Sequence, residues 1–226
     1  MEIDYTAHSF KIDNGETLHY YDISNSISHH GAVAGLVKNE LKFDLLSQDE
    51  QFTYIDVGAN CGIFGLYIAK KFKNSNVLLF ECNPLMIKAI NLSIIANHLT
   101  NVQLYPFGLS NQNITEKIFF NFNNPGGCGI YKTDDDKIDF NGLFYDFETI
   151  LNVHDNIKYL KIDIEGAEFN IFNKLIESNS KFFQKVSILN LEFHNNIYPN
   201  LEDIVTRKRI KDYLSSFSNL KCIYQS

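Results

Sequence analysis

Side chains that could do chemistry follow four short apolar segments of the sequence, at the point where each segment ends. They are Asp56 and Asn60 after "FTYI", Glu81 and Asn83 after "NVLLF", Asp163 and Glu165 after "IKYLKI", and Glu192 and His194 after "KVSILNL". A single residue of this kind is often only a helix cap or a turn former. Four segments that all end in such groups indicate a site at which several parts of the chain meet.

The residues after Asp56 predict a nucleoside site. Gly58 allows a sharp turn, and Gly62 lets the following helix pack closely. Glu81 follows roughly 20 residues further on, the spacing at which an acid accepts both hydroxyls of a ribose. The sequence has neither G-x-G-x-x-G nor G-x-x-x-x-G-K-[ST], and Asp56 would repel a phosphate but suits an ammonium group. A ribose, an amino-acid end and no phosphate together indicate S-adenosylmethionine.

The spacing of apolar residues predicts the elements that position these groups. A hairpin is expected around Asn14-Gly15. Helices are expected at residues 28–46, 63–72, 84–98, 167–176 and 203–217. Strands are expected at residues 52–57, 76–81, 101–107, 116–122, 157–164, 185–194 and 220–225. Apolar strands that alternate with helices indicate an α/β fold with a mostly parallel sheet covered on both faces. Ligands of such sheets bind outside the carboxyl ends of the strands.

The length of the chain favours one domain over residues 1–226. Within it we expect an N-terminal hairpin and helix as an extension, at residues 1–50. Residues 51–226 would form the cofactor-binding core, with an insertion around residues 110–147. The extension and the insertion are the parts in which we expect specificity for the substrate.

Four segments carry a resemblance to a known family. They are "YIDVGANCGIFGLYIA", "LLFECNP", "YLKIDIEGAEFNIF" and "LNLEFH", and together they resemble the motif series of the FkbM family of S-adenosylmethionine-dependent methyltransferases, from Phe52 to His194. The resemblance implies the class I methyltransferase fold, a Rossmann-like three-layer sandwich with about seven strands, the last one antiparallel. It also implies methyl transfer, usually to a hydroxyl group of a sugar or of another small molecule.

The resemblance assigns roles to residues at the predicted sheet edge. It implies that Asp56, Gly58 and Asn60 surround the methionine end of the cofactor, and that Glu81 holds the ribose. Further candidates for cofactor binding are Asn83 beside the ribose acid, Asp163, and, at the place where this fold meets the adenine, Phe107 and Gly108. The family often has proline directly after the ribose acid, whereas Cys82 and Asn83 intervene here.

The transfer step needs a group that takes the proton of an alcohol. The candidates are Asp163, Glu165, Glu168, Glu192 and His194. A neutral imidazole makes His194 the best single base, with Asp163 and Glu192 as its partners. Alternatively, Asp163, Glu165 and Glu192 could hold Mg²⁺ or Mn²⁺. We favour the metal-free route, since the resemblance carries no metal motif, but the sequence leaves both open.

The net charge of −7 disfavours nucleic acid as a partner, and with it the alternative of an RNA ribose methyltransferase. A catalytically inactive cofactor-binding protein is a second alternative. The missing G-x-G-x-x-G disfavours a nicotinamide oxidoreductase. Without a signal peptide, an apolar span or a disulfide pattern, we expect a cytoplasmic protein that acts on a small molecule or a glycan. The acceptor and the oligomeric state stay open.

Overall fold

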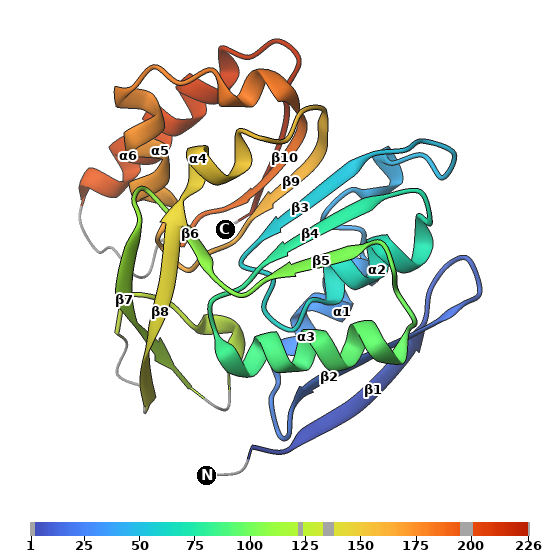
Figure 1. The fold of residues 1–226 in the computed structure, drawn as a ribbon. Coiled ribbons are helices and arrows are strands. Elements are labelled where there is room, and N and C mark those ends of the chain that lie inside the picture. Colours follow the sequence, from blue (N-terminus) through green and yellow to red (C-terminus); the bar gives the residue numbers. More distant parts are fainter. Residues whose placement is uncertain (1–2, 122–123, 133–137, 195–200, 226) are drawn as a thin grey trace.

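The computed structural model describes residues 3–121, 124–132, 138–194 and 201–225. Its centre is a sheet with the strand order β5-β4-β3-β9-β10-β11 (Figure 1). The strands are β3 (Thr53–Val57), β4 (Asn76–Phe80), β5 (Val102–Tyr105), β9 (Ile157–Ile162), β10 (Val186–Glu192) and β11 (Lys221–Gln225). The chain order reverses between β3 and β9, and ligands of open α/β sheets bind at such a switch point.

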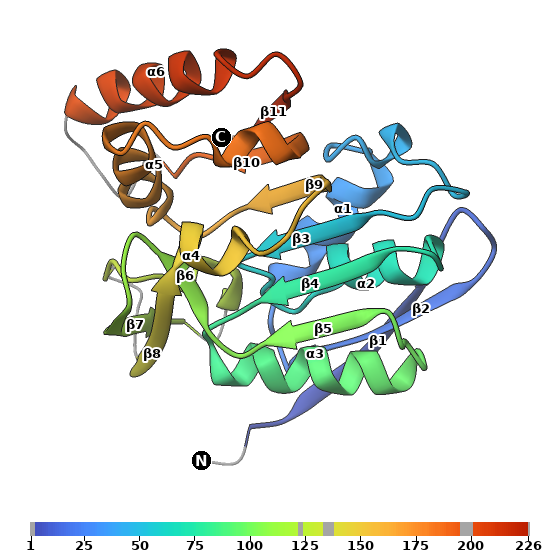
Figure 2. The same ribbon diagram turned by 45° about the horizontal axis from the view of Figure 1, so that its top comes forward.

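Helices cover both faces of the sheet, as the sequence predicts. One face carries α1 (Ser28–Val37), α2 (Ile63–Lys71) and α3 (Pro84–Ala96), and the other carries α4 (Phe147–Leu151), α5 (Glu168–Glu177) and α6 (Leu201–Ser215) (Figure 2). Successive side chains of a strand point to opposite faces. Ile55 and Val57 of β3 therefore join the core under α5, while Tyr54 joins the core under α2.

The central sheet differs from the expected one in its last strand. Within the described residues this sheet has six strands, and β11 runs parallel to β10, with Ile188 opposite Lys221 and Glu192 opposite Gln225. The antiparallel last strand that the resemblance implied is therefore wrong for this structure. The reason is the connection: α6 returns the chain across a face of the sheet, and a helical crossover of this kind delivers the next strand in the same direction.

A smaller sheet forms within the segment predicted as an insertion. It has the order β6-β8-β7 and contains β6 (Gly108–Ser110), β7 (Ile114–Phe120) and β8 (Ile138–Asp146). Of these strands, the sequence predicted only β7. A 3₁₀ turn, η2 (Pro125–Gly127), follows β7, and the Phe119–Gly129 bridge then ties this segment back to it. The small sheet stands beside the carboxyl ends of β3 and β4 (Figure 1).

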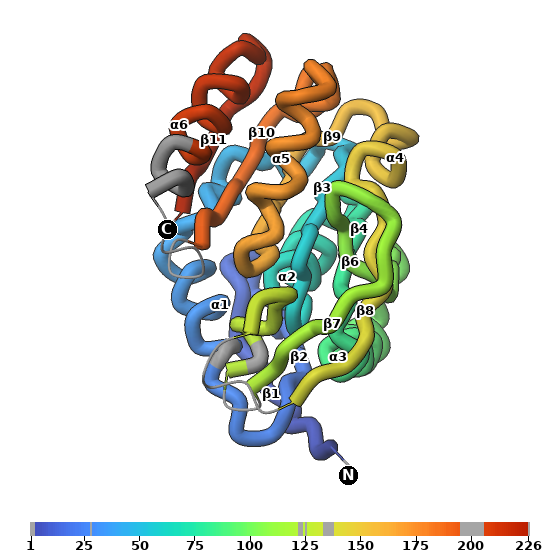
Figure 3. The backbone as a smooth tube through the Cα atoms, turned by 90° about the vertical axis from the view of Figure 1, so that its left-hand side faces the viewer, coloured from blue at the N-terminus to red at the C-terminus, as the bar shows by residue number. Residues whose placement is uncertain are grey.

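The N-terminal hairpin is confirmed, with β1 (Tyr5–Lys11) and β2 (Thr17–Ile23) joined across Asn14-Gly15. It packs on α3, where the Tyr21 N–H donates to Ser93 Oγ at 2.9 Å. Figure 3 shows the hairpin at the end of the molecule far from α6.

The helix predicted over residues 28–46 ends at Val37 instead. The chain turns there because Asn39 and Lys42 adopt left-handed backbone angles, with φ of 51° and 56°, which a right-handed helix does not allow. Two further 3₁₀ turns are η1 (Phe43–Leu45) and η3 (Phe182–Lys185). Among the described residues, none of the helices is long and apolar enough to span a lipid bilayer.

Candidate functional site

Two cavities meet at the carboxyl edge of the sheet. The smaller cavity, of about 70 Å³, lies between the end of β4 and the small sheet. The larger cavity, of about 800 Å³, extends from the ends of β9, β10 and β11 to α1. Five residues belong to the lining of both cavities, and we call them the junction: Gly58, Asn60, Gly126, Asp163 and Glu165. Four of the five come from the loops that follow β3 and β9, the two strands of the switch point.

Backbone contact between these two loops shapes the junction. Gly58 has a φ of +82°, and a β-carbon there would lie 1.9 Å from the carbonyl oxygen of Asp163. The N–H of Asp163 in turn donates to the carbonyl of Val57 at 3.0 Å. Only glycine fits between these two segments of the chain. The close contact therefore explains why a glycine follows β3.

Glu81 presents a preorganised carboxylate to the smaller cavity. It is 7% exposed and follows the last residue of β4. Its Oε2 accepts the N–H of Asn60 at 2.7 Å, and its Oε1 accepts the N–H of Asn83 at 2.8 Å. Burial raises the pKa of Glu81 to about 7, although these two bonds oppose the shift. Each oxygen keeps further acceptor capacity, so the carboxylate is suited to accept bonds from a pair of hydroxyl groups.

Three predicted cofactor-binding residues lie at different places relative to the smaller cavity. Gly108 lines it, and a β-carbon there would lie 2.6 Å from the ring of Phe144. Asn83 is not among the lining residues; it is fully buried and caps α3, with its Oδ1 accepting the N–H of Leu85 at 2.9 Å. Phe107 is also outside the lining; it is partly buried and packs against the core, with its ring centroid 4.7 Å from that of Tyr145. Only Gly108 of the three therefore faces the space.

Asp56 is buried and is not among the residues that line either cavity. It shares the face of β3 with Tyr54, whose hydroxyl donates to its Oδ2 at 3.3 Å. The ammonium of Lys161, on the neighbouring β9, lies 3.4 Å from the Oδ1 of Asp56 and 2.9 Å from the Oδ2 of Asp163. Burial raises the pKa of Asp56, with Lys161 opposing the shift. Lys161 thus links the buried acid to the acid at the junction.

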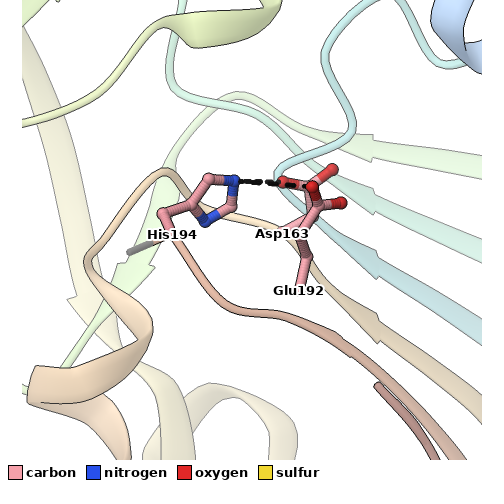
Figure 4. Close-up of side chains that lie close together, drawn as sticks. All are labelled: Asp163, Glu192 and His194. Atoms are coloured by element: carbon pink, nitrogen blue, oxygen red, sulfur yellow. Dashed lines mark ion pairs between the residues drawn. The ribbon is translucent and has the colours of Figure 1, made fainter. Parts of the chain in front are cut away.

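His194 faces the carboxylates of Asp163 and Glu192 (Figure 4), and two further carboxylates lie close to its ring. Its Nε2 is 3.4 Å from Asp163 Oδ1, 3.6 Å from Glu165 Oε2 and 3.9 Å from Glu192 Oε1. On the other side of the ring, Nδ1 is 3.2 Å from the Oε1 of Glu168, which also accepts the backbone N–H of His194 at 2.9 Å. Three elements, the ends of β9 and β10 and the start of α5, therefore supply this group.

The carboxylates change the protonation of His194. Burial by itself would lower its pKa, but the bond with Glu168 and the charges of Glu165 and Asp163 outweigh burial and raise the pKa to about 9. Burial raises the pKa of Glu165 to about 7, and it also raises the pKa of Glu192. At neutral pH the imidazole is therefore protonated in the absence of another cation, whereas the sequence analysis expected a neutral base.

Several residues of the site escaped the sequence analysis. Lys161 carried a signal, because a lysine inside an otherwise apolar strand needs a partner when it is buried. The other residues had no signal in the sequence, because they line the larger cavity only once the chain has folded. They are Gly31, Gly35 and Lys38 of the α1 region, Phe64 of α2, and Tyr224 and Gln225 of β11.

Two known proteins, both named as methyltransferases, are similar to this chain. The chain is 22% identical over 162 residues to "Methyltransferase 1" of Beauveria bassiana (strain ARSEF 2860). The aligned segment covers 62% of this chain and 64% of that protein. It is also 22% identical over 198 residues to "Methyltransferase sdnD" of Sordaria araneosa. This aligned segment covers 74% of this chain and 76% of that protein. The chain thus spans less than two thirds of the length of the first relative.

The family comparison covers more than half of the chain. Residues 56–216 match the family described as "Methyltransferase FkbM domain". The matched segment begins at the last polar residue of β3 and ends just after α6, so it contains the junction, Glu81 and the carboxylates around His194. The chain therefore belongs to the FkbM family of methyltransferase domains.

Proposed function

We propose that this protein transfers a methyl group from S-adenosylmethionine to a hydroxyl group of a sugar, a glycan or another small polyhydroxylated molecule. The observation that carries the proposal is the junction, where the small cavity beside Glu81 opens into a larger polar cavity. Two substrates that exchange a methyl group must meet in line at a single point. Family membership supports the same reaction class.

The residues around the smaller cavity fit the cofactor, which would supply a methyl group on a sulfonium cation. Glu81 would accept the ribose hydroxyls, beside an apolar wall for the base that includes Leu109, Ile118 and Phe144. At the junction, the Oδ1 of Asn60 is buried and has no hydrogen-bond partner among the described residues. It would accept a bond from the ammonium group of the cofactor, and the carboxylate of Asp163 would balance the positive charge.

Asp56 would act on the cofactor indirectly. Its carboxylate faces Lys161 instead of the junction, so we propose that it fixes Lys161, which in turn fixes Asp163. In the same way, Asn83 would support Glu81 through its backbone N–H. Phe107 would act through the packing of the chain before Gly108.

The larger cavity suits an acceptor with several hydroxyl groups. Its volume of about 800 Å³ lies within the usual range for ligand pockets. Its wall contains carboxylate and amide oxygens, which accept bonds from hydroxyl groups, and two aromatic rings on which a sugar ring could stack. These residues are Asn124, Asp163, Glu165, Glu192 and Gln225, with the rings of Phe64 and Tyr224.

In the proposed reaction the acceptor oxygen forms a bond to the methyl carbon while the carbon–sulfur bond breaks and leaves its electron pair on sulfur. The hydroxyl proton must go to a base. Protonated His194 cannot take it, so we assign this task to a carboxylate at its Nε2, among Asp163, Glu165 and Glu192. His194 would hold these carboxylates in place and balance their charge.

The alternatives are less well supported. An RNA ribose methyltransferase would need a basic groove, whereas the larger cavity contains three carboxylates near the junction. An inactive cofactor-binding protein would not need the ordered group of acids around His194. We place the protein in the cytoplasm, because Cys61, Cys82 and Cys222 are free thiols and thiols persist in a reducing compartment.

Calorimetry with S-adenosylmethionine and its demethylated product tests the proposal. We expect both to bind, and Glu81→Ala to weaken binding by about 1–3 kcal/mol, as for a lost hydrogen bond to a charged group. The exposed Glu177, at the end of α5, provides a matched control as Glu177→Ala. Unchanged affinity in Glu81→Ala would remove the ribose assignment. Failure of the wild-type protein to bind either compound would overturn the proposed function.

A further inference from the structure

We infer that Asp163, Glu192 and His194 form a binding site for one divalent cation, with Mn²⁺ as the best fit. Each residue offers one ligand atom, and these atoms all lie within 4.8 Å of one another. Two carboxylate oxygens and one imidazole nitrogen combine the oxygen donors that suit Mg²⁺ and Mn²⁺ with a nitrogen donor that favours a transition metal. This mixed set differs from the all-carboxylate set expected from the sequence, because His194 replaces Glu165.

The two distances from the imidazole to the carboxylates match those between ligands of a single ion. Ligand atoms that each lie about 2.0–2.2 Å from one ion are roughly 3–4 Å from one another. The Nε2 of His194 is 3.4 Å from the Oδ1 of Asp163 and 3.9 Å from the Oε1 of Glu192. The imidazole points at both carboxylates (Figure 4). Little movement is therefore needed to close the three atoms on an ion.

A buried carboxylate outside the ligand set orients the imidazole. Glu168 is 0% exposed, and its Oε1 faces the Nδ1 of His194 at 3.2 Å. Its Oε2 accepts the N–H of Gly166 at 2.9 Å. A histidine that binds a metal through one ring nitrogen typically donates its other N–H to such a carboxylate. Glu168 thus leaves Nε2 free to face Asp163 and Glu192.

A second buried residue orients Asp163. The ammonium of Lys161 donates to Asp163 Oδ2 at 2.9 Å, and so leaves Oδ1 as the oxygen that faces His194. Lys161 is itself 2% exposed. Two of the three proposed ligands are therefore held by buried charged residues that do not touch the ion.

The charges around the site also call for a cation. The imidazole is surrounded by the carboxylates of Asp163, Glu165, Glu168 and Glu192. Asp163 is paired with the ammonium of Lys161, whereas Glu165, Glu168 and Glu192 have no lysine or arginine as an ion-pair partner among the described residues. Partly buried negative charge without a partner is costly. A divalent cation would remove the imbalance.

The role of the ion rests on the proposed function. Asp163 and Glu192 line the larger cavity, so an ion between them would face the acceptor. We propose that it holds two neighbouring oxygens of the acceptor, which names a vicinal diol as the substrate class. A cation also lowers the pKa of a hydroxyl group that it contacts. The proton released when the oxygen takes the methyl group would go to Glu165, which lies 3.6 Å from Nε2 and is not in the ligand set.

Direct measurement of Mn²⁺ binding tests the site without any turnover. The full chain, purified in EDTA and then dialysed, is titrated with Mn²⁺ and followed by electron paramagnetic resonance. We expect one saturable site in the wild-type protein. His194→Ala, Glu192→Gln and Glu168→Gln should each weaken it by about 10–100-fold, and Glu177→Gln should leave it unchanged. Because Glu192 is partly exposed, the Glu192→Gln variant tests the site even if His194→Ala fails to fold.

The outcomes separate this inference from the proposed function. No saturable binding in the wild-type protein, or equal affinity in folded Glu192→Gln, would overturn the cation site. Calorimetry with S-adenosylmethionine in EDTA measures the cofactor site independently, so either site can fail alone. For the role of the ion, methyl transfer to a vicinal diol should stop in EDTA and return with Mn²⁺. Full transfer in EDTA by a protein that binds Mn²⁺ would overturn that role.

Discussion

A β-carbon on Gly58 would lie 1.9 Å from the carbonyl oxygen of Asp163, so the loops after β3 and β9 touch through their backbones. This contact fixes the distance between the loop after β3, to which we assign the cofactor, and the carboxylates after β9. The geometry of the site therefore depends on a residue that has no side chain.

We predict that Gly58→Ala destabilises the protein by at least about 2 kcal/mol, because it combines a left-handed backbone angle with a clash against backbone. Denaturant unfolding measures the change. Gly31→Ala is the matched control: it lies in α1 and nothing lies within 4 Å of its added β-carbon. We expect this control to be neutral or stabilising. Equal stability of Gly58→Ala and the wild-type protein would contradict the close contact.

The second prediction concerns Asn83, which caps α3. Asn83→Ala should lower the free energy of unfolding by about 1 kcal/mol, as for other lost caps. Asn83→Asp should keep most of the stability, since aspartate also caps helices. Affinity for S-adenosylmethionine should change much less in Asn83→Ala than in Glu81→Ala. If calorimetry gives equal losses in both variants, the side chain of Asn83 binds the cofactor directly.

The third prediction is a pH dependence of stability that comes from Glu81. Burial raises its pKa in the folded protein from the ordinary value of 4.5 to about 7. The folded state therefore binds a proton more tightly than the unfolded chain. The stability that this group contributes is present in full below about pH 4.5 and is lost as the pH rises to about 7.

Thermal unfolding from pH 5 to pH 7.5, without ligand, tests this prediction. Glu81→Gln cannot titrate, so its stability should fall less over this range than that of the wild-type protein. Glu177→Gln, which changes an exposed acid, should retain the wild-type slope. Identical slopes for Glu81→Gln and the wild-type protein would show that Glu81 stays ionised.

The fourth prediction concerns the buried charge of Lys161. Lys161→Met should destabilise the protein by about 3–5 kcal/mol, because it leaves the carboxylate of Asp56 buried without its cation. Adding Asp56→Asn removes that charge and should recover part of the loss. Urea unfolding of both variants measures the difference. A single variant as stable as the wild-type protein, or a double variant less stable than the single one, would be inconsistent with this pairing.

Much of the fold could be predicted from the sequence, because the relevant signals are local. The apolar segments predicted the strands of the central sheet, and Asn14-Gly15 predicted the N-terminal hairpin. The strands β6 and β8 escaped prediction. Strand β6 has only three residues, and β8 begins after a polar segment and has a partly exposed alternating pattern, so neither has a strong signal of its own.

For the site, the sequence by itself determined which residues follow the strands, and hence that Gly58, Glu81, Asp163 and Glu192 lie at one edge. Only the tertiary structure decided which way each side chain points. Asp56 is one residue short of that edge on the α2 face of its strand, beside Lys161, because strand side chains alternate.

The tertiary structure also decided the charge of His194. Its partners Asp163, Glu165, Glu168 and Glu192 lie 2 to 31 residues away in the sequence, and its pKa depends on their distances in space. The direction of β11 was decided in the same way, by the path of α6 over the sheet. Residue types and strand ends are local properties of a chain, whereas charges, pairings and cavities depend on contacts between distant segments, which form only when the chain folds.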